Sequence, residues 1–310
     1  MPPRPDLPRD PSGVLNLAKP TGMTSRDVVD LVSRPLRKVK VGHAGTLDPL
    51  ASGVLVVCIG GATRLIDRVQ AMPKAYRAVI RLGATSDTLD ADGRVTPHPD
   101  PDLVAPTKAA VRAALAGQVG VIQQVPPQFS ALKVEGKRAY DLARAGEAVA
   151  LAARPVRVDR VELIAYAWPR LEVAVDCGSG TYIRSIARDV GAALGVGGLI
   201  EVLVRTRIGP FTLEDALDPT GRPIGAILAR LRPPGDALGG TPRLVLDAPQ
   251  VAIAAGGKLL DPARVAGGAG LAPGEVALIG PDGALVALAE VLPTGAIQPR
   301  KVFAPPAGEP

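Results

Sequence analysis

A glycine-rich loop that leads directly into an apolar segment is the feature that most constrains this chain. Residues 42–53 (Gly-His-Ala-Gly-Thr-Leu-Asp-Pro-Leu-Ala-Ser-Gly) contain a single carboxylate, and residues 54–59 that follow predict a buried strand. A glycine-rich loop anchored on a core strand lets a ligand approach the backbone closely. Asp48 is the only acidic residue between Asp30 and Asp67. If a carboxylate performs chemistry in this loop, it is therefore Asp48.

Asp48 has a second interpretation, which is compatible with the first. An Asp-Pro pair is a common turn or helix start, and in a helix the aspartate would be the N-cap and Pro49 would take the first helical position. A capping aspartate can also face a pocket. The spacing of these residues therefore does not decide between the two roles.

The distribution of charge points to an anionic partner. The chain of 310 residues has a formal net charge of +6, and its basic residues gather in three clusters. These clusters are Arg34, Arg37, Lys38 and Lys40; Lys133, Lys137, Arg138 and Arg144; and Arg205 with Arg207. Basic clusters around a functional loop fit a polyanionic substrate better than a small one.

Membrane and redox roles are not indicated. The longest apolar run, residues 54–59, is far shorter than the roughly 20 residues that span a bilayer. Residues 1–13 contain no apolar signal segment, so we expect a cytoplasmic protein with no membrane partner. Cys58 and Cys177 both lie in apolar, strand-like segments, and we expect them to be small buried hydrophobic residues.

No metal site is predicted. His43 and His98 lack metal-ligand spacing with each other and with the cysteines. The acidic segment 87–93 does not match a calcium loop, because Thr88 would take the first ligand position and Pro99 the twelfth, where a glutamate is required. We expect a polar hairpin turn there instead.

Turn residues and apolar segments predict two folded units. We expect a disordered tail over residues 1–13, a first unit over 14–215 with a projecting basic insertion at about 125–150, and a linker at 216–242. A small all-β unit follows at 243–304, with residues 251–255 among its apolar runs, and then a tail at 305–310. Strands are expected at 14–17, 54–59, 76–82, 156–164 and 171–177, and helices after Thr24 or Ser25, at 107–117 and from Thr181.

Arg184 is unusual in its predicted helix. The helix after Thr181 places Ile183, Ile186 and Val190 on one apolar face, and Arg184 lies off that face in the first turn. A cation there opposes the helix dipole by about 0.3–1 kcal/mol. Either an acid from elsewhere in the chain, such as Asp48, compensates it, or the arginine is solvated.

One competing enzyme class comes from residues 175–180, which end a strand with Gly-Ser-Gly before that helix. This pattern is similar to the glycine-rich loop of nucleotide- or S-adenosylmethionine-binding domains, and Glu201 lies about 20 residues on, where a ribose-binding acid is expected. Tyr182 replaces the third glycine, however, and no alternation of strands and helices follows. A methyltransferase therefore stays only as an alternative.

An ordered set of motifs resembles one known family. Residues 42–53 closely resemble the catalytic motif of the TruB-type tRNA pseudouridine synthases. Further matches follow the order of that family across residues 14–211. They are 19–25 (Lys-Pro-Thr-Gly-Met-Thr-Ser), 76–77 with the turn at 87–93, 127–140, and 180–184 (Gly-Thr-Tyr-Ile-Arg). The segment ending at 299–303 looks like the C-terminal PUA-type domain of the family.

The resemblance implies a fold and a reaction. The fold would be α+β, with a mixed, largely antiparallel pseudouridine-synthase-type sheet, flanking helices and a small all-β PUA-like domain. The reaction would be isomerisation of the T-loop uridine, position 55, of tRNA, by a monomer without cofactor or metal. Asp48 would be the catalytic carboxylate, which attacks the ribose C1′ or removes the 2′ proton. Arg184 would be its ion-pair partner and would keep it ionised.

The resemblance also assigns roles to other residues. Tyr76 would stack on the flipped base, Lys133 would contact RNA from the insertion, and Lys19 with Pro20 would form a structural motif. His43, Tyr182 and Leu203 match positions that line the pocket. Leu199, Val204 and Phe129 depart from residues common in the family, and these departures concern RNA contacts. An RNA-binding or RNA-folding protein without catalysis is the alternative, since it would share the basic clusters but would not need Asp48.

Overall fold

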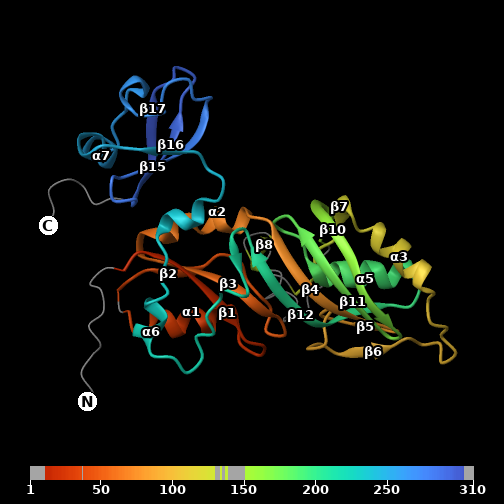
Figure 1. The fold of residues 1–310 in the computed structure, drawn as a ribbon. Coiled ribbons are helices and arrows are strands. Elements are labelled where there is room, and N and C mark those ends of the chain that lie inside the picture. The colour runs from red at the N-terminus through yellow and green to blue at the C-terminus, as the bar shows by residue number, and fades with distance from the viewer. Residues whose placement is uncertain (1–10, 37, 130–132, 135–136, 139–150, 304–310) are drawn as a thin grey trace, which may run out of the picture.

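A computed structural model describes residues 11–36, 38–129, 133–134, 137–138 and 151–303. Within these residues, a nine-stranded sheet forms the centre of the first unit, in the order β1-β3-β12-β4-β11-β10-β7, with β13 beside β12 and β2 beside β3 (Figure 1). Its strands are β1 (Gly13–Lys19), β2 (Val41–His43), β3 (Ser52–Ile59), β4 (Lys74–Leu82), β7 (Gly120–Gln124), β10 (Arg154–Ala167), β11 (Arg170–Cys177), β12 (Gly198–Ile208) and β13 (Phe211–Thr212).

The sheet is mixed and largely antiparallel, as expected. Its described pairs are antiparallel except for β3 and β12, which run parallel where Arg205 lies beside Gly53. This parallel contact joins the end of the glycine-rich loop to β12, a strand almost 150 residues later in the chain. The two-stranded pairs β5 (Ala84–Ser86) with β6 (Val95–Pro97), and β8 (Lys133–Val134) with β9 (Lys137–Arg138), lie outside this sheet.

Helices begin where the sequence supplies caps. Thr24 and Asp27 form a capping box at α1 (Ser25–Ser33), and Thr107 caps α3 (Lys108–Ala116). In α5 (Ile183–Ala193) the apolar face packs into the core against β12 and β4, which confirms the predicted face. Among the described residues, the other helices of the first unit are η1 (Gly60–Leu65), α2 (Ile66–Ala71), α6 (Ile224–Leu228) and η2 (Pro234–Leu238).

The C-terminal unit contains the expected small sheet, in the order β14 (Arg243–Val245), β15 (Gly274–Ile279), β16 (Leu285–Val291) and β17 (Ile297–Val302). It also contains α7 (Ala248–Ala255) and η3 (Pro262–Arg264). The expectation of a strand at residues 251–255 was wrong, and so the unit is not purely β. A capping box between Asp247 and Gln250, with proline in the first turn, starts a helix there.

Residues 216–242 are not an extended linker, contrary to our expectation. Val14 and Arg232 exchange two backbone hydrogen bonds of 2.9 Å, and Leu217 bonds to β1. Ile227 is buried with the apolar residues of α1 and β3. The proline and glycine residues shape turns, while the apolar residues between them complete the core. Residue 11 is buried and β1 begins at Gly13, so residues 11–13 of the predicted tail belong to the fold; residues 1–10 lie outside the described residues.

The C-terminal unit lies above α2 in Figure 1. Two arginines, one on η1 and one on α2, bond the first unit to it. Arg64 donates a hydrogen bond to the Val302 carbonyl, and its guanidinium lies 5.0 Å from the centre of the Phe303 ring. Arg68 forms an ion pair with Glu275 and donates to the hydroxyl of Thr241. In the described part of the chain, the helices are too short and too polar to cross a bilayer.

Substitution of Gly53 tests whether β3 and β12 approach each other too closely for a side chain. The φ of Gly53 is +106°, and a Cβ atom would lie 2.2 Å from the carbonyl oxygen of Arg205. We expect Gly53→Ala to lower the free energy of unfolding by about 3 kcal/mol. Gly221 has a φ of +68° but no atom within 4 Å of a built Cβ, so Gly221→Ala is the matched control, with a loss of about 1 kcal/mol. Urea unfolding of both variants measures the difference, and equal losses would contradict the steric argument.

Candidate active site

The glycine-rich loop connects β2 to β3 and is tied to the start of α1. The Leu47 amide donates to the Ser25 hydroxyl at 2.8 Å, and that hydroxyl donates to the Leu47 carbonyl at 3.1 Å. The Ala51 amide bonds to the Asp48 carbonyl at 3.1 Å, which closes a turn before β3. No helix begins at Asp48, because β3 starts at Ser52. The turn that the Asp-Pro pair predicts is therefore confirmed, whereas the helix N-cap is not, and the Asp48 side chain is available for another role.

Arg184 holds the Asp48 carboxylate in a two-pronged contact. Its Nε lies 3.0 Å from Oδ2 of Asp48, and its Nη2 donates to Oδ1 at 3.1 Å. The Arg184 side chain is 6% exposed, whereas that of Asp48 is 36% exposed. The predicted partnership is confirmed, and the alternative of a solvated Arg184 is excluded. The Asp48 carboxylate is thus partly accessible to solvent, whereas the Arg184 guanidinium that pairs with it is buried.

A second carboxylate, which sequence reasoning missed, contacts the same arginine. Asp90 Oδ2 lies 3.4 Å from Arg184 Nη1, and its side chain is 6% exposed. The Thr88 hydroxyl donates to Asp90 Oδ1 at 2.6 Å, and the Thr88 carbonyl accepts from Arg184 Nη1 at 2.8 Å. The acidic turn at 87–93 was the available signal. We interpreted it as a hairpin turn, which β5 and β6 confirm, but its link to Arg184 comes only from the tertiary structure.

The electrostatic environment of Asp48 contains opposing effects. Burial raises the pKa of Asp48 above its ordinary value, the Arg184 guanidinium lowers it, and Asp90 raises it again. Burial is the largest of these effects, so the pKa of Asp48 stays above its ordinary value although Arg184 favours the ionised form. The sequence had suggested only that Arg184 favours the ionised form.

Lys19 forms hydrogen bonds with Pro20 and with the loop that carries Asp48. The Lys19 side chain is buried, and its Nζ donates to the carbonyls of Pro20 at 3.0 Å, Met23 at 2.5 Å and Pro49 at 3.3 Å. Burial lowers the pKa of Lys19 to about 8, and Asp48 opposes this shift. The lysine is therefore still largely protonated at neutral pH, and it fixes the residue next to Asp48.

Tyr76, Leu203 and His43 lie around the loop. Tyr76 and Leu203 belong to the hydrophobic core cluster that also contains Leu47 and Ala51 of the loop. Burial raises the pKa of the Tyr76 hydroxyl. His43 ends β2, its Nδ1 is buried without a hydrogen-bond partner among the described residues, and burial lowers the pKa of the imidazole. These residues therefore place apolar and aromatic surface beside Asp48.

Tyr182 occupies the position before α5 and is fixed by a residue that sequence reasoning missed. Its amide donates to Gln124 Oε1 at 2.8 Å, and Gln124 Nε2 donates to its carbonyl at 3.2 Å. The guanidinium of Arg154 lies 5.3 Å from the centre of the Tyr182 ring. Lys133 lies in the short strand β8, and its side chain is outside the described residues, as is most of the predicted insertion.

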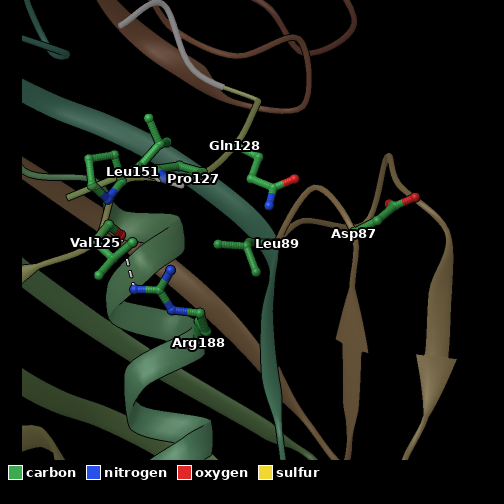
Figure 2. A pocket seen from close by; sticks show the side chains of 8 residues that line it. Asp87, Leu89, Val125, Pro127, Gln128, Leu151 and Arg188 are labelled. Carbon is green, nitrogen blue, oxygen red and sulfur yellow. Dashed lines mark hydrogen bonds between the residues drawn. The ribbon is translucent and has the colours of Figure 1, made fainter. Parts of the chain in front are cut away.

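A cavity of about 550 Å³ lies beside α5, next to Arg188. Figure 2 shows the side chains that line it, which are Asp87, Leu89, Val125, Pro126, Pro127, Gln128, Leu151 and Arg188. Arg188 lies one turn after Arg184 on α5 and donates to the Val125 carbonyl at 3.0 Å. Arg184 itself donates to the Phe129 carbonyl at 2.9 Å. The turn at 87–89 and the segment at 125–129 both line the cavity. The same two segments bond to Arg184, through the carbonyls of Thr88 and Phe129.

The structure also bears on the third basic cluster, on the two cysteines and on the methyltransferase alternative. Arg205 is buried and so is not part of a surface cluster, while Arg207 pairs with Asp176 at 3.0 Å. Cys58 and Cys177 are buried free thiols, as expected, and burial raises their pKa values to about 12 and about 11. Among the described residues, no cluster of histidine, cysteine or acidic side chains is arranged to hold a metal ion. The largely antiparallel sheet removes the methyltransferase alternative.

Comparisons with known proteins agree with this geometry. Residues 33–183 match the model of the TruB family pseudouridylate synthase (N terminal domain). A tRNA pseudouridine synthase B from Thermobifida fusca is 43% identical over 307 residues, which cover 94% of this chain and 98% of that protein. This chain belongs to the TruB family. A second tRNA pseudouridine synthase B, from Mycolicibacterium paratuberculosis, is 50% identical over 210 residues, or 66% of this chain and 71% of that protein.

Solved structures extend the TruB family likeness to the whole fold. A chain in a structure of an H/ACA RNP bound to a substrate RNA containing 2'-deoxyuridine superposes with a TM-score of 0.71 at 26% identity, covering 96% of this chain and 87% of that chain. A chain of a Cbf5-Nop10-Gar1 complex gives a TM-score of 0.71 at 27% identity, covering 95% and 85%. Both likenesses include the C-terminal unit, since they cover almost the entire chain.

Arg184→Met tests the electrostatic role of the ion pair. Removing the guanidinium leaves Asp48 with burial and Asp90, both of which raise its pKa. We expect a large loss of pseudouridine formation, and the acidic limb of the pH–rate profile should move to higher pH, because Asp48 must ionise to act. Arg184→Lys should restore only part of the rate, since an ammonium group cannot form both contacts.

Asp90→Asn should shift the pKa of Asp48 in the direction opposite to Arg184→Met. Because Asp90 raises the pKa of Asp48, its neutralisation should move the acidic limb to lower pH. Profiles of the wild type and of these variants on one tRNA substrate give both shifts. An acidic limb that stays in place in Arg184→Met would mean that Arg184 does not control the ionisation of Asp48.

Proposed function

We propose that this chain isomerises the T-loop uridine at position 55 of tRNA to pseudouridine, with Asp48 as the catalytic carboxylate. The observation that carries the proposal is the partly exposed Asp48 carboxylate, held in two contacts by the buried Arg184. Membership of the TruB family, and relatives named tRNA pseudouridine synthase B, support both the reaction and the substrate.

The reaction breaks one bond and forms one bond at the same sugar carbon. The bond between C1′ and N1 breaks, the uracil turns, and C1′ bonds to C5, which loses a proton while N1 gains one. The ionised Asp48 either attacks C1′ or removes the 2′ proton. Arg184 favours the ionised form of Asp48 and orients it toward the open side of the loop. Because substrate and product have the same composition, we propose that no redox cofactor or group donor takes part.

The flipped base would occupy the space beside the loop. We propose that Tyr76 stacks on it, which contributes about 1–3 kcal/mol, and that His43, Tyr182 and Leu203 line the rest of the pocket. The position of Tyr76 and Leu203 next to Leu47 and Ala51 supports this assignment. Taking the base out of the RNA loop costs a few kcal/mol, which these contacts would offset.

The RNA backbone would be held by cationic side chains. We propose that Lys133 binds phosphate, that the cavity beside Arg188 takes RNA next to the target uridine, and that Lys19 and Pro20 have a structural role. We further propose that the protein acts as a cytoplasmic monomer without a metal, since Asp48, Arg184 and Asp90 all come from one chain.

Asp48→Asn tests catalysis directly. The variant should bind an unmodified tRNA transcript with near wild-type affinity but form no pseudouridine, because the amide cannot act as a nucleophile or base. Asp67→Asn, which changes an exposed carboxylate of α2, is the matched control and should keep full activity. Mapping of pseudouridine after incubation, together with a filter-binding assay, gives both quantities. Near-normal turnover by Asp48→Asn would remove Asp48 from the mechanism, and RNA binding by an inactive wild type would favour the non-catalytic alternative.

Lys133→Ala tests the RNA contact. Loss of one phosphate contact should weaken tRNA binding and reduce the slope of log affinity against log salt by about one unit. Lys108→Ala, at the exposed start of α3, is the control and should leave the slope unchanged. Binding measured over a series of salt concentrations decides the point, and an unchanged slope for Lys133→Ala would make Lys133 a solvated surface residue.

A further inference from the structure

Arg205 is a buried charge without an acidic partner. It lies in β12, is 1% exposed, and is among the largest fully buried side chains of the described residues. Its guanidinium donates to three neutral backbone carbonyls: Nε to Val54 at 2.8 Å, Nη2 to Gly45 at 3.0 Å and Nη1 to Thr46 at 3.4 Å. Among the described residues, no carboxylate lies within ion-pair distance of it. Burying such a charge is costly, so the contacts that it makes require an explanation.

The three acceptors lie on both sides of Asp48: two belong to the loop that carries it, and the third belongs to β3. Gly45 and Thr46 precede Asp48, and Val54 follows it at the start of the buried strand. Arg205 therefore closes both ends of the catalytic loop onto β12 with one side chain. Gly45 has a φ of +116°, and Arg205 Nη1 is the atom nearest to where its Cβ would be, at 3.7 Å.

The position of Arg205 in the sheet also links it to Tyr76. In the register of the sheet, Arg205 lies opposite Gly53 of β3 on one side and opposite Tyr76 of β4 on the other. Its charge lowers the pKa of the Tyr76 hydroxyl and that of the Asp48 carboxyl, against the effect of burial on both groups. One guanidinium thus connects the loop of the proposed catalytic carboxylate to the strand of the proposed stacking tyrosine.

We propose that Arg205 is a positioning residue of the isomerisation, which fixes the Asp48 loop relative to Tyr76 and supplies a fixed positive charge beneath the base pocket. The proposal rests on the proposed function. When the C1′–N1 bond breaks, its electron pair leaves with the uracil as delocalised negative charge; C5 then bonds to C1′ and loses its proton, and N1 gains one. A preorganised cation close to developing negative charge stabilises such a step without reorganisation. The same contacts keep Asp48 at its reacting distance.

Two variants of Arg205 separate its effect on the position of the Asp48 loop from the effect of its charge. Arg205→Lys keeps the charge but cannot reach both ends of the loop, whereas Arg205→Met removes both. We expect kcat to fall about tenfold in Arg205→Lys and about 100-fold in Arg205→Met, with KM for tRNA within about threefold of the wild type. Arg170→Lys is the matched control, because Arg170 pairs with Glu201 at the surface of the same sheet. It should keep wild-type kcat.

A second measurement does not depend on activity. Hydrogen exchange of the peptide covering residues 42–56 should be faster in both Arg205 variants and unchanged in Arg170→Lys, with thermal unfolding recorded for each. A kcat within threefold of the wild type in a folded Arg205→Met would overturn the proposal, as would equal losses of kcat and of tRNA binding. If neither Arg205 variant folds, Arg205 is only a structural residue and the proposal is overturned. If the wild type and Arg170→Lys form no pseudouridine, the proposed function fails, while the exchange result still reports on the loop.

Discussion

The contact between Arg184 and Asp48 is the interaction on which the candidate site depends. A single buried guanidinium joins the glycine-rich loop, the acidic turn at 87–93 and the segment that ends at Phe129, because it bonds to Asp48, to Asp90 and to two carbonyls. A buried cation needs such a complete set of partners, since each unmet contact would leave the cost of desolvation uncompensated. The geometry of the site is therefore a consequence of satisfying one arginine.

A second buried arginine contacts the same loop from a different element. Arg184 approaches the loop from helix α5 and bonds to a side chain, whereas Arg205 approaches from strand β12 and bonds to main-chain carbonyls. Together they surround the carboxylate with positive charge, which opposes the rise in its pKa caused by burial. Glycine at positions 45 and 53 permits the left-handed backbone that this arrangement requires.

Local features were predictable because they depend on neighbouring residues. The caps of α1 and α3, the strands β1, β3, β4, β10 and β11, and the apolar face of α5 all followed from residues within a few positions of one another. Residues 251–255 show the limit, since an apolar run fits a strand or a buried helix, and the capping box at Asp247 decided for the helix. Residues 216–242 were interpreted as a linker because of their proline and glycine content. That interpretation failed because Ile227 and Leu238 are buried by partners far away in sequence.

The sequence by itself determined which carboxylate is central, since Asp48 stands alone in a loop whose motif identifies the family. It also indicated that Arg184 needed an acidic partner, because a cation in the first turn of a helix is unfavourable. Only the tertiary structure decided that Asp90 shares this arginine, that Arg205 is internal, and that Gln124 fixes Tyr182. The physical reason is sequence separation: Asp48 and Arg184 are 136 positions apart, and no local propensity encodes which distant groups meet once the sheet has brought its strands into register.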